Sequence, residues 1–268
     1  NLILGVAGQF SLGHAGFIAI GSYSGAILGK MMNGLPGLFV GMAVGVVISV
    51  MVAFLVGLPT LRLKGDYLAI ATLGVAEIIR VAVTNMKITN GAAGISGIPL
   101  TNTWTITYIF LVFTTILILN YTFSSAGRAT YGVLQDEIAA ESMGVQVTKY
   151  KILAFVLGAA TASIGGTLSA TTLGVVTPGD FTFMKSIDVL IIVVFGGIGS
   201  FTGSFVAAVL LGIINLVLQP FGQLRMIIYA VALILIMIFR PGGLLGTWEF
   251  KLGNLNFSKK KEAKESGK

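Results

Sequence analysis

The sequence predicts an all-α membrane protein: a polytopic bundle of transmembrane helices, with broken helices and a short cytoplasmic helix. Of its 268 residues, 55% are hydrophobic and only 10% are charged, whereas soluble domains carry about 25% charged residues. The mean hydropathy is +0.95. Long apolar runs such as residues 190–195 and 230–239 lack the alternation of a membrane β-strand. At about 20 residues per crossing, the length allows roughly seven or eight membrane segments.

The first apolar run is interrupted by a polar segment at residues 11–16, which contains Ser11 and the only histidine, His14. The flanking runs, 2–10 and 17–28, are each too short to cross a bilayer, so we expect one broken span or two half-helices. Such a break is tolerated only against protein or a water-filled cavity. We expect His14 either to bond a carbonyl freed by the break or to line a polar cavity. The chain opens inside this run without a signal-peptide pattern, so we also expect a further helix before residue 1.

The later apolar stretches cover residues 38–58, 68–83, 106–123, 152–173, 187–195, 205–218 and 224–239. Trp104, Tyr108 and Tyr121 lie near the ends of the third stretch, where interfacial aromatic residues are common. A long polar stretch, 124–151, separates the first three from the others. We expect a transmembrane domain over residues 1–248, which includes this polar stretch, and a basic cytoplasmic tail over 249–268.

The distribution of lysine and arginine predicts the orientation. If residues 124–151 are cytoplasmic, most basic residues fall on the cytoplasmic side, as the positive-inside rule requires. These are Arg62, Lys64, Arg128, Lys149, Lys151, Arg240, Lys251 and the tail lysines, against Lys30, Lys87, Lys185 and Arg225 outside. The chain carries a net charge of +7. We interpret its basic tail as a solvated end near the anionic leaflet of the lipid bilayer, and expect no nucleic-acid partner.

Ionisable residues at membrane depth are costly and therefore informative. Glu77 and Arg80 are three residues apart, so on a helix they share a face and can pair. We expect an internal ion pair satisfied against a neighbouring helix, or a pair beside a translocation path. Asp188 begins an apolar stretch, where its carboxylate suits a helix N-terminus. The glycine-rich segment 195–203 is either a tight turn or a second unwound segment.

Motifs for several chemistries are absent from the sequence. It has no G-x-x-x-x-G-K-[ST] nucleotide loop, no H-E-x-x-H metal motif and no cysteine. No plausible Ser–His–Asp set can be assembled, since the lone histidine, His14, would have to serve every such role, so we expect no enzyme activity and no cofactor bound by this chain. A self-contained secondary transporter is an alternative. Glu77 is its one candidate for ion coupling, and Arg80 beside it disfavours proton coupling.

The polar stretch predicts a short helix over residues 136–143, because its composition favours helix, its acidic residues come first and Gly144 is placed to end it. Ala139 and Ala140 are small enough for this helix to sit in a groove. A short cytoplasmic helix between two spans is a shape that a partner protein can push on. The stretch is equally compatible with a generic cytoplasmic loop.

Several motifs, specific in combination, resemble one family. They are residues 8–17 (GQFSLGHAGF), 61–73 (LRLKGDYLAIATL), 89–91 (TNG) with 94–95, 136–144, 178–181 (PGDF), 195–200 (FGGIGS) and 240–246 (RPGGLLG). Together they resemble the LivM-type permease of branched-chain amino acid ABC importers, from about residue 5 to residue 247.

The resemblance implies a multi-pass permease subunit of the bacterial cytoplasmic (inner) membrane. Its implied partners are a LivH-type second permease, two LivG/LivF-type ATPase subunits that hold ATP and Mg, and an extracytoplasmic binding protein that delivers leucine, isoleucine or valine. Related permeases carry urea or short amides, which is the alternative substrate class. The implied path is lined by Ser11, His14, Asn90, Gly196, Gly197 and Gly199.

The resemblance also gives the predicted cytoplasmic helix the role of a coupling helix that docks on an ATPase subunit. The implied coupling residues are Glu137, Ala139, Ala140 and Gly144. Here the sequence departs from the general importer pattern, since Ile138 stands where a glutamate is expected and Glu137 comes one position early.

Overall fold

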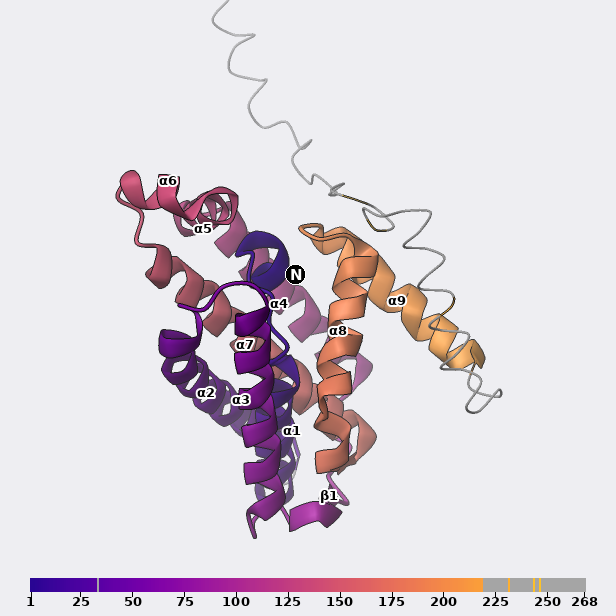
Figure 1. Ribbon diagram of the computed structural model, residues 1–268. Coiled ribbons are helices and arrows are strands. Elements are labelled where there is room, and N and C mark those ends of the chain that lie inside the picture. Colours follow the sequence, from indigo (N-terminus) through magenta and orange to yellow (C-terminus); the bar gives the residue numbers. More distant parts are fainter. Residues whose placement is uncertain (33, 219–230, 232–242, 244–245, 247–268) are drawn as a thin grey trace, which may run out of the picture. The chain divides into compact units, whose positions relative to one another are not determined.

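The computed structural model describes residues 1–32, 34–218, 231, 243 and 246. Apart from residue 231, the expected span at 224–239 lies outside the described residues, as does the expected tail at 249–268. The chain divides into two compact units, Asn1–Ile191 and Ile192–Lys268, and each is described separately (Figure 1).

The described residues are mostly helical, which confirms the all-α class. Five of the described helices are long and apolar enough to cross a membrane: α2 (Leu35–Thr60), α3 (Asp66–Asn85), α4 (Trp104–Phe123), α7 (Val147–Leu173) and α9 (Phe201–Leu218). The other α-helices are α1 (His14–Met32), α5 (Ser125–Gln135), α6 (Glu137–Ser142) and α8 (Phe183–Gly196). The expected polytopic bundle is therefore present, with short helices between its long ones.

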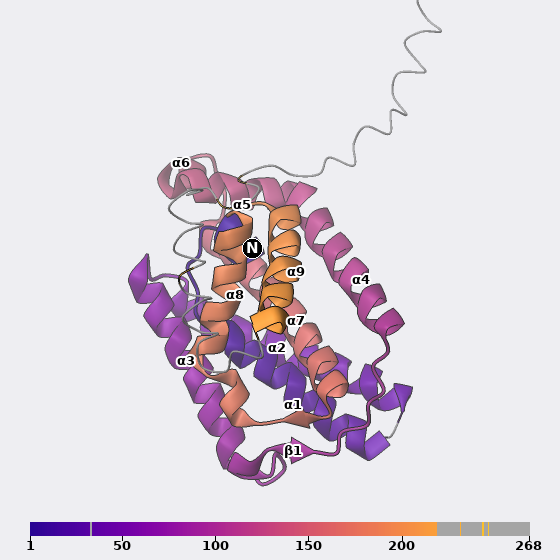
Figure 2. The same ribbon diagram turned by 90° about the vertical axis from the view of Figure 1, so that its right-hand side faces the viewer.

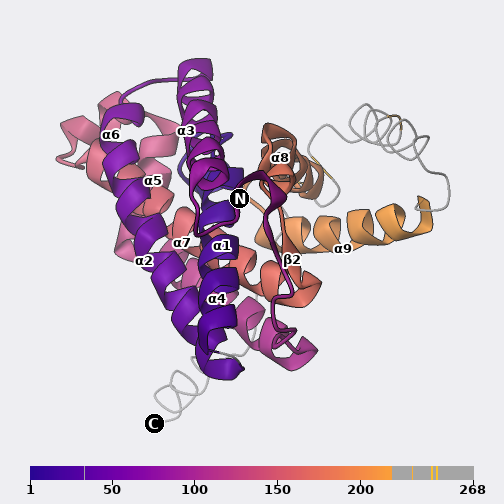
Figure 3. The same cartoon turned by 90° about the horizontal axis from the view of Figure 1, so that it is seen from below.

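The core of the first unit is formed by α1, α2 and α7, which pack against one another (Figures 1 and 3). Glycine allows α1 and α2 to approach closely. A Cβ atom on Gly41 would lie 2.9 Å from Cα of Gly25, and one on Gly45 would lie 3.2 Å from Cα of Gly21. Small residues at helix interfaces let backbones meet in this way in membrane bundles.

Helices α1 and α7 are joined by polar and aromatic contacts. The Ser22 hydroxyl donates a hydrogen bond to the carbonyl of Gly166, and the Thr167 hydroxyl donates one to the carbonyl of Gly21, both at 2.9 Å. Nearer the N-terminal ends of both helices, the rings of Phe17 and Phe155 meet edge to face, with centroids 5.6 Å apart. Hydroxyl bonds across helices and edge-to-face rings both hold apolar helices in register.

The N-terminal break exists, but its boundaries differ from the expected ones. A short π-helical turn, η1 (Leu2–Val6), is followed by non-helical backbone at residues 8–13, and α1 then begins at His14. At 1.5 Å per residue its 19 residues extend roughly 28 Å, but α1 is not among the described helices that are both long and apolar enough to cross a membrane. The helix extends beyond the run 17–28 in both directions, and the expectation that this run is too short to cross by itself stays a prediction.

The two ends of the first unit differ in structure. Helices α5 and α6 lie at one end, while the two-stranded antiparallel sheet of β1 (Ile95–Ser96) and β2 (Val175–Val176) lies at the other (Figures 1 and 2). Two 3-10 turns flank the sheet in sequence, η2 (Gly91–Ala93) and η3 (Pro178–Phe181). From the distribution of basic residues, we expect the α5–α6 end to be cytoplasmic and the sheet end to be extracytoplasmic.

The described part of the second unit begins within α8 and continues through α9. Residues 197–200 form a tight turn between these helices, in which Gly197 and Gly199 have φ angles of 112° and 91°. A Cβ atom on Gly203 would lie 2.9 Å from the carbonyl carbon of Gly196, so the two helices meet directly at their shared turn. Of the two alternatives for the glycine-rich segment, the tight turn is the correct one.

Candidate functional site

The N-terminal break is held by hydrogen bonds from neighbouring elements. The backbone N–H of Leu12 donates to Oγ1 of Thr72 on α3, and that of Ala15 donates to Oγ of Ser186 on α8, each at 3.0 Å. The N–H of Gly13 is bonded to Oγ of Ser11 at 3.3 Å. Backbone groups freed at the break therefore have side-chain partners, as membrane depth demands.

Ser11 and His14 both belong to this break: Ser11 is buried, and His14, the first residue of α1, is half-buried. Asn90 lies elsewhere, in the loop after α3 at the end of the first unit that carries the sheet. Its backbone has a φ of 61° and its Nδ2 donates to the carbonyl of Gly94 at 3.0 Å. It shares a cavity of about 320 Å³ with Lys30, near the end of α1. His14 and Lys30 are at opposite ends of α1, so the structure does not bring Asn90 together with Ser11 and His14.

Gly196, Gly197 and Gly199 belong to the α8–α9 turn in the second unit. Gly196 and Gly197 are buried, and the positive φ angles of Gly197 and Gly199 explain why glycine is needed there. Their local role is to close the turn and to let α8 and α9 touch.

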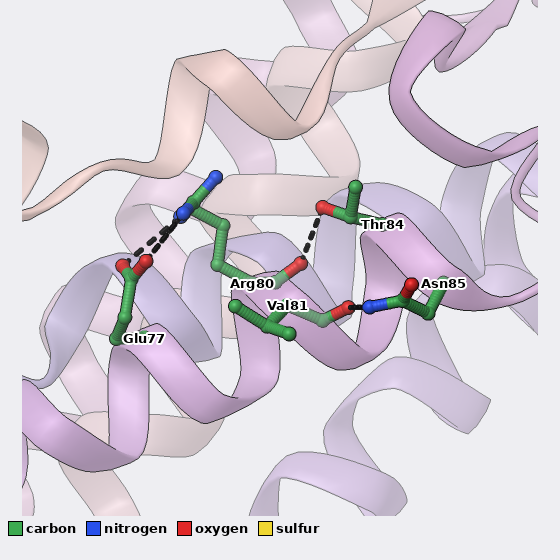
Figure 4. Close-up of polar contacts among 5 residues, drawn as sticks. All are labelled: Glu77, Arg80, Val81, Thr84 and Asn85. Carbon is green, nitrogen blue, oxygen red and sulfur yellow. Dashed lines mark hydrogen bonds and ion pairs between the residues drawn. The ribbon is translucent and has the colours of Figure 1, made fainter.

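Glu77 and Arg80 form the expected ion pair on successive turns of α3 (Figure 4). Arg80 Nε donates to both carboxylate oxygens of Glu77 at 3.0 Å, and Arg80 Nη2 adds a further bond to Oε1. Farther along α3, Thr84 Oγ1 donates to the carbonyl of Arg80 at 2.8 Å and Asn85 Nδ2 donates to that of Val81 at 2.7 Å (Figure 4). This face of α3 is thus more polar than a lipid-facing helix surface.

The chain by itself leaves the pair partly exposed, so the expectation of an internal pair stays a prediction for the assembled protein. The side chain of Glu77 is 48% exposed and that of Arg80 is 27% exposed. Within the described residues, neither side chain has a hydrogen-bonding or ionic partner on another helix. Charged groups on bilayer-spanning helices face protein or water instead of acyl chains. This face of α3 therefore requires a cover beyond its own helix, either protein or an aqueous path.

The end of the first unit opposite the sheet carries the expected short helix, α6 (Figure 1). Asp136 Oδ1 accepts hydrogen bonds from the N–H groups of Ile138 at 2.9 Å and Ala139 at 3.1 Å, an N-cap that fixes where the helix begins. Gly144, with a φ of 82°, follows its end. Helix α5, which precedes it, was not expected. It is capped by Ser124, whose Oγ accepts from the N–H of Gly127 at 3.2 Å, so the stretch 124–151 contains two helices.

The residues implied for coupling lie on two sides of α6. Ala140 is buried and Glu137 is half-buried, so both face the bundle, whereas Ala139 and Gly144 are exposed. The outward side also carries two large apolar side chains that were not among the implied coupling residues, Ile138 and Met143, with exposed fractions of 77% and 85%. Their apolar character inside a polar stretch was the available signal for them.

Glu137 connects α6 to the bundle. Its Oε1 pairs with Nζ of Lys151 on α7, and its Oε2 lies 3.3 Å from Nζ of Lys64, in the turn between α2 and α3. Burial by itself raises the pKa of the Glu137 carboxyl. The hydrogen bonds and positive charges of Lys151 and Lys64 outweigh burial and bring the pKa below its ordinary value.

Lys151 also connects α6 to the N-terminal break. Its backbone carbonyl accepts a hydrogen bond from Nε2 of Gln9 at 3.1 Å, and the side chain of Gln9 is buried. Gln9, Lys151 and Glu137 thus form one continuous polar chain from the break to helix α6. Sequence analysis did not identify Gln9, although an amide inside an apolar run was a visible signal.

No metal site is evident in the described part of the chain, where no group of three or more histidine, cysteine, aspartate or glutamate residues could hold an ion. The arrangement is that of a helical membrane bundle with a polar break, a charged helix face and exposed apolar side chains, Ile138 and Met143, at the end opposite the sheet.

Comparison with known proteins gives a consistent result. The family model described as "Branched-chain amino acid transport system / permease component" matches residues 1–239. The high-affinity branched-chain amino acid transport system permease protein LivM of Salmonella typhimurium (strain LT2) is 36% identical over 280 residues, covering 91% of this chain and 65% of the relative. LivM of Escherichia coli (strain K12) is 35% identical with the same coverage.

A more distant relative is the permease protein LivH of the same Escherichia coli strain, 30% identical over 53% of this chain and 46% of its own length. The chain therefore spans 65% of the length of the LivM relatives that it matches. No solved structure gives a significant match.

Proposed function

This chain belongs to the permease family of branched-chain amino acid transport systems, and from that premise we propose that it forms half of the translocation path of an ABC importer. The cargo is leucine, isoleucine or valine, delivered by an extracytoplasmic binding protein. A LivH-type permease supplies the other half of the path. Two LivG/LivF-type subunits bind ATP and Mg and hydrolyse the ATP, so the chain itself is no enzyme. The assembly is placed in the bacterial cytoplasmic (inner) membrane.

The observation that carries this proposal is the difference between the two sides of α6, one apolar and exposed and the other bonded to the bundle. A helix with Ile138 and Met143 exposed in the cytoplasm leaves apolar surface in water, which is unfavourable unless a partner covers it. The opposite side is fastened to the bundle through Glu137. We propose that the outer side docks in a groove of one ATPase subunit, and that Ala139 and Gly144 let the two backbones approach.

Coupling then follows the polar chain from α6 to the break. When the ATPase subunits close, α6 is displaced and Glu137 carries the displacement to Lys64 and Lys151. Lys151 in turn holds Gln9 beside the non-helical segment that contains Ser11 and His14. We propose that this segment lines the path at membrane depth, because its backbone has no helix to absorb a shift.

The charged face of α3 is the observation that favours a second permease subunit as a partner. An ion pair in which Glu77 is 48% exposed is unfavourable against acyl chains. We propose that the LivH-type subunit covers this face, with the path between the two permeases. Asn90, Gly196, Gly197 and Gly199 are assigned to the path on the family resemblance alone.

Two alternatives remain distinguishable. A self-contained secondary transporter would use Glu77 as its coupling group, but the three bonds from Arg80 already occupy that carboxylate. A permease for urea or short amides would share the coupling machinery and differ only in cargo.

The composition of the intact complex tests the proposal. We expect the tagged chain, extracted from its native membrane in mild detergent, to bring with it two ATPase polypeptides and a second permease, identified by mass spectrometry. Recovery of the folded chain alone would contradict the proposal and favour the secondary transporter. The Ile138→Asp variant should lose the ATPase polypeptides and keep the second permease, while Gln146→Asp, an exposed change outside α6, should retain all partners.

A further inference from the structure

A cavity of about 320 Å³ opens in the first unit at its extracytoplasmic end, among α1, α7, β2, η3 and the first turns of α8. Much of its wall is apolar and includes Ile18, Leu173 and Met184. Its size is at the lower end of the range for small-molecule sites, where few polar groups fix orientation and apolar groups supply contact area.

Three charged residues of both signs line the same cavity: Asp180, Lys185 and Asp188. Asp188 was expected to sit at a helix N-terminus, but α8 begins at Phe183, so Asp188 lies in its second turn and does not cap it. Lys185 and Asp188 are three residues apart on α8, yet no ion pair joins them, and within residues 1–32 and 34–218 neither side chain has a hydrogen bond.

Only one of the two carboxylate oxygens of Asp180 accepts hydrogen bonds from the described part of the protein. Its Oδ2 accepts hydrogen bonds from both the N–H and the hydroxyl of Thr177, each at 2.9 Å, which closes a capping box around η3. Its Oδ1 has no such partner in the described ranges. The cavity therefore presents one ammonium group and carboxylate oxygens that the protein itself leaves without counter-charges, beside an apolar wall.

We infer that this cavity is an acceptor site for an aliphatic amino acid in its zwitterionic form. Lys185 binds the α-carboxylate, Asp188 and Oδ1 of Asp180 bind the α-ammonium group, and the branched side chain lies on Ile18, Leu173 and Met184. Charge-assisted bonds of both signs match a zwitterion. Urea or a neutral amide would leave both protein charges without counter-charges.

The inference rests on the proposed function and specifies the substrate class and the residues that receive it. The cavity lies at the end of the bundle where an amino acid released by an extracytoplasmic binding protein would arrive. Because the binding protein supplies selectivity before this step, a modest affinity suffices here.

The test measures ligand binding to the permease complex in nanodiscs without the binding protein. Leucine should bind wild type and weaken roughly tenfold in Lys185→Gln and in Asp188→Asn, since each loses one charge-assisted bond. Leucinamide, which has no carboxylate, should be insensitive to Lys185→Gln. 4-Methylpentanoate, which has no ammonium group, should be insensitive to Asp188→Asn. Lys87→Gln, at the same end but outside the cavity, is the matched control.

Wild-type leucine affinity in both charge variants would overturn the inference, and so would competition by urea as effective as that by unlabelled leucine. Leu173→Trp, at an exposed position of the cavity wall, provides an independent test because it should block the cavity without removing a charge. The same variants are also reconstituted into sealed proteoliposomes with the binding protein outside and ATP on the ATPase side. If the ATPase subunits are retained and leucine import is unaffected by these variants, the acceptor site is contradicted and the proposed function is not. If wild type neither retains the ATPase subunits nor imports leucine with ATP, the proposed function is contradicted instead.

Discussion

Glu137 and Lys151 are joined by an ion pair that fastens helix α6 to α7 near its start. The carbonyl of the same lysine accepts a hydrogen bond from Gln9, which lies in the non-helical segment 8–13. One residue of α7 thus connects α6 with the irregular backbone of the N-terminal break. A force applied to α6 has a continuous route into the bundle through packed and bonded groups.

The ion pair predicts a pH-dependent contribution to stability. The folded-state pKa of Glu137 lies below its ordinary value of 4.5, so the native state favours the ionised carboxylate. Its contribution is therefore fully present above pH 4.5 and is lost as the pH falls through the folded-state pKa. We expect Glu137→Gln to lower the thermal midpoint of the detergent-solubilised protein at pH 7, and the difference from wild type to shrink below pH 4.5. A difference that stays constant down to pH 3 would show that the pair contributes nothing.

The outward face of α6 predicts separate effects on coupling and on folding. Ile138→Asp and Met143→Asp place a charge where an apolar groove is expected, and should abolish transport while the permease remains inserted and as stable as wild type. Ile138→Leu keeps the apolar surface and should transport normally. Uptake by reconstituted complexes and thermal unfolding of the same samples provide the two readouts. Normal transport in both aspartate variants would remove α6 from the mechanism.

The contact between α1 and α2 predicts a steric effect of a single methyl group. Gly41→Ala places a Cβ atom 2.9 Å from Cα of Gly25, so the two helices must separate. Overpacking of this kind costs about 1–3 kcal/mol. Gly165→Ala on α7 meets no atom within 4 Å and should be neutral or slightly stabilising, since alanine favours helix. Chemical unfolding in mild detergent compares the two, and equal stability would contradict the close approach.

The charged face of α3 predicts a non-additive effect. Arg80→Leu leaves the Glu77 carboxylate without its partner, at a cost of about 2.5–3.5 kcal/mol for an unpaired charge at membrane depth. The double change Glu77→Leu with Arg80→Leu removes both charges and should assemble with the second permease better than either single variant. The amount of that permease recovered with the tagged chain is the measurement. Recovery that falls further in the double variant would show that the charges themselves bind the partner.

Hydropathy predicted the long helices well. Stretches 38–58, 68–83, 106–123 and 152–173 correspond to α2, α3, α4 and α7, because apolar length alone decides whether a segment crosses a bilayer. It missed the full length of α1, which is His14–Met32 instead of 17–28, because Gly21, Gly25 and Gly29 dilute the apolar signal although most of the helix is packed against protein. Glycine lowers the hydropathy at the positions that pack most closely, so hydropathy underestimates the length of such a helix.

Which way each side chain faces could not be predicted to the same extent. Pairing of Glu77 with Arg80 followed from their spacing, but exposure of that pair depends on which face of α3 meets its neighbours. Likewise, the helix at α6 was predicted from its cap and composition, whereas the inward side of Glu137 is set by Lys64 and Lys151. Partners brought together by the fold decide these points, and local sequence does not encode them.

Leucine uptake into sealed proteoliposomes containing the purified complex tests the central claim most directly. The account predicts that uptake requires the binding protein outside and ATP on the ATPase side. It also predicts that uptake continues when ionophores collapse the proton and sodium gradients. Uptake by this chain without ATP, driven by an imposed ion gradient and abolished by Glu77→Gln, would contradict it.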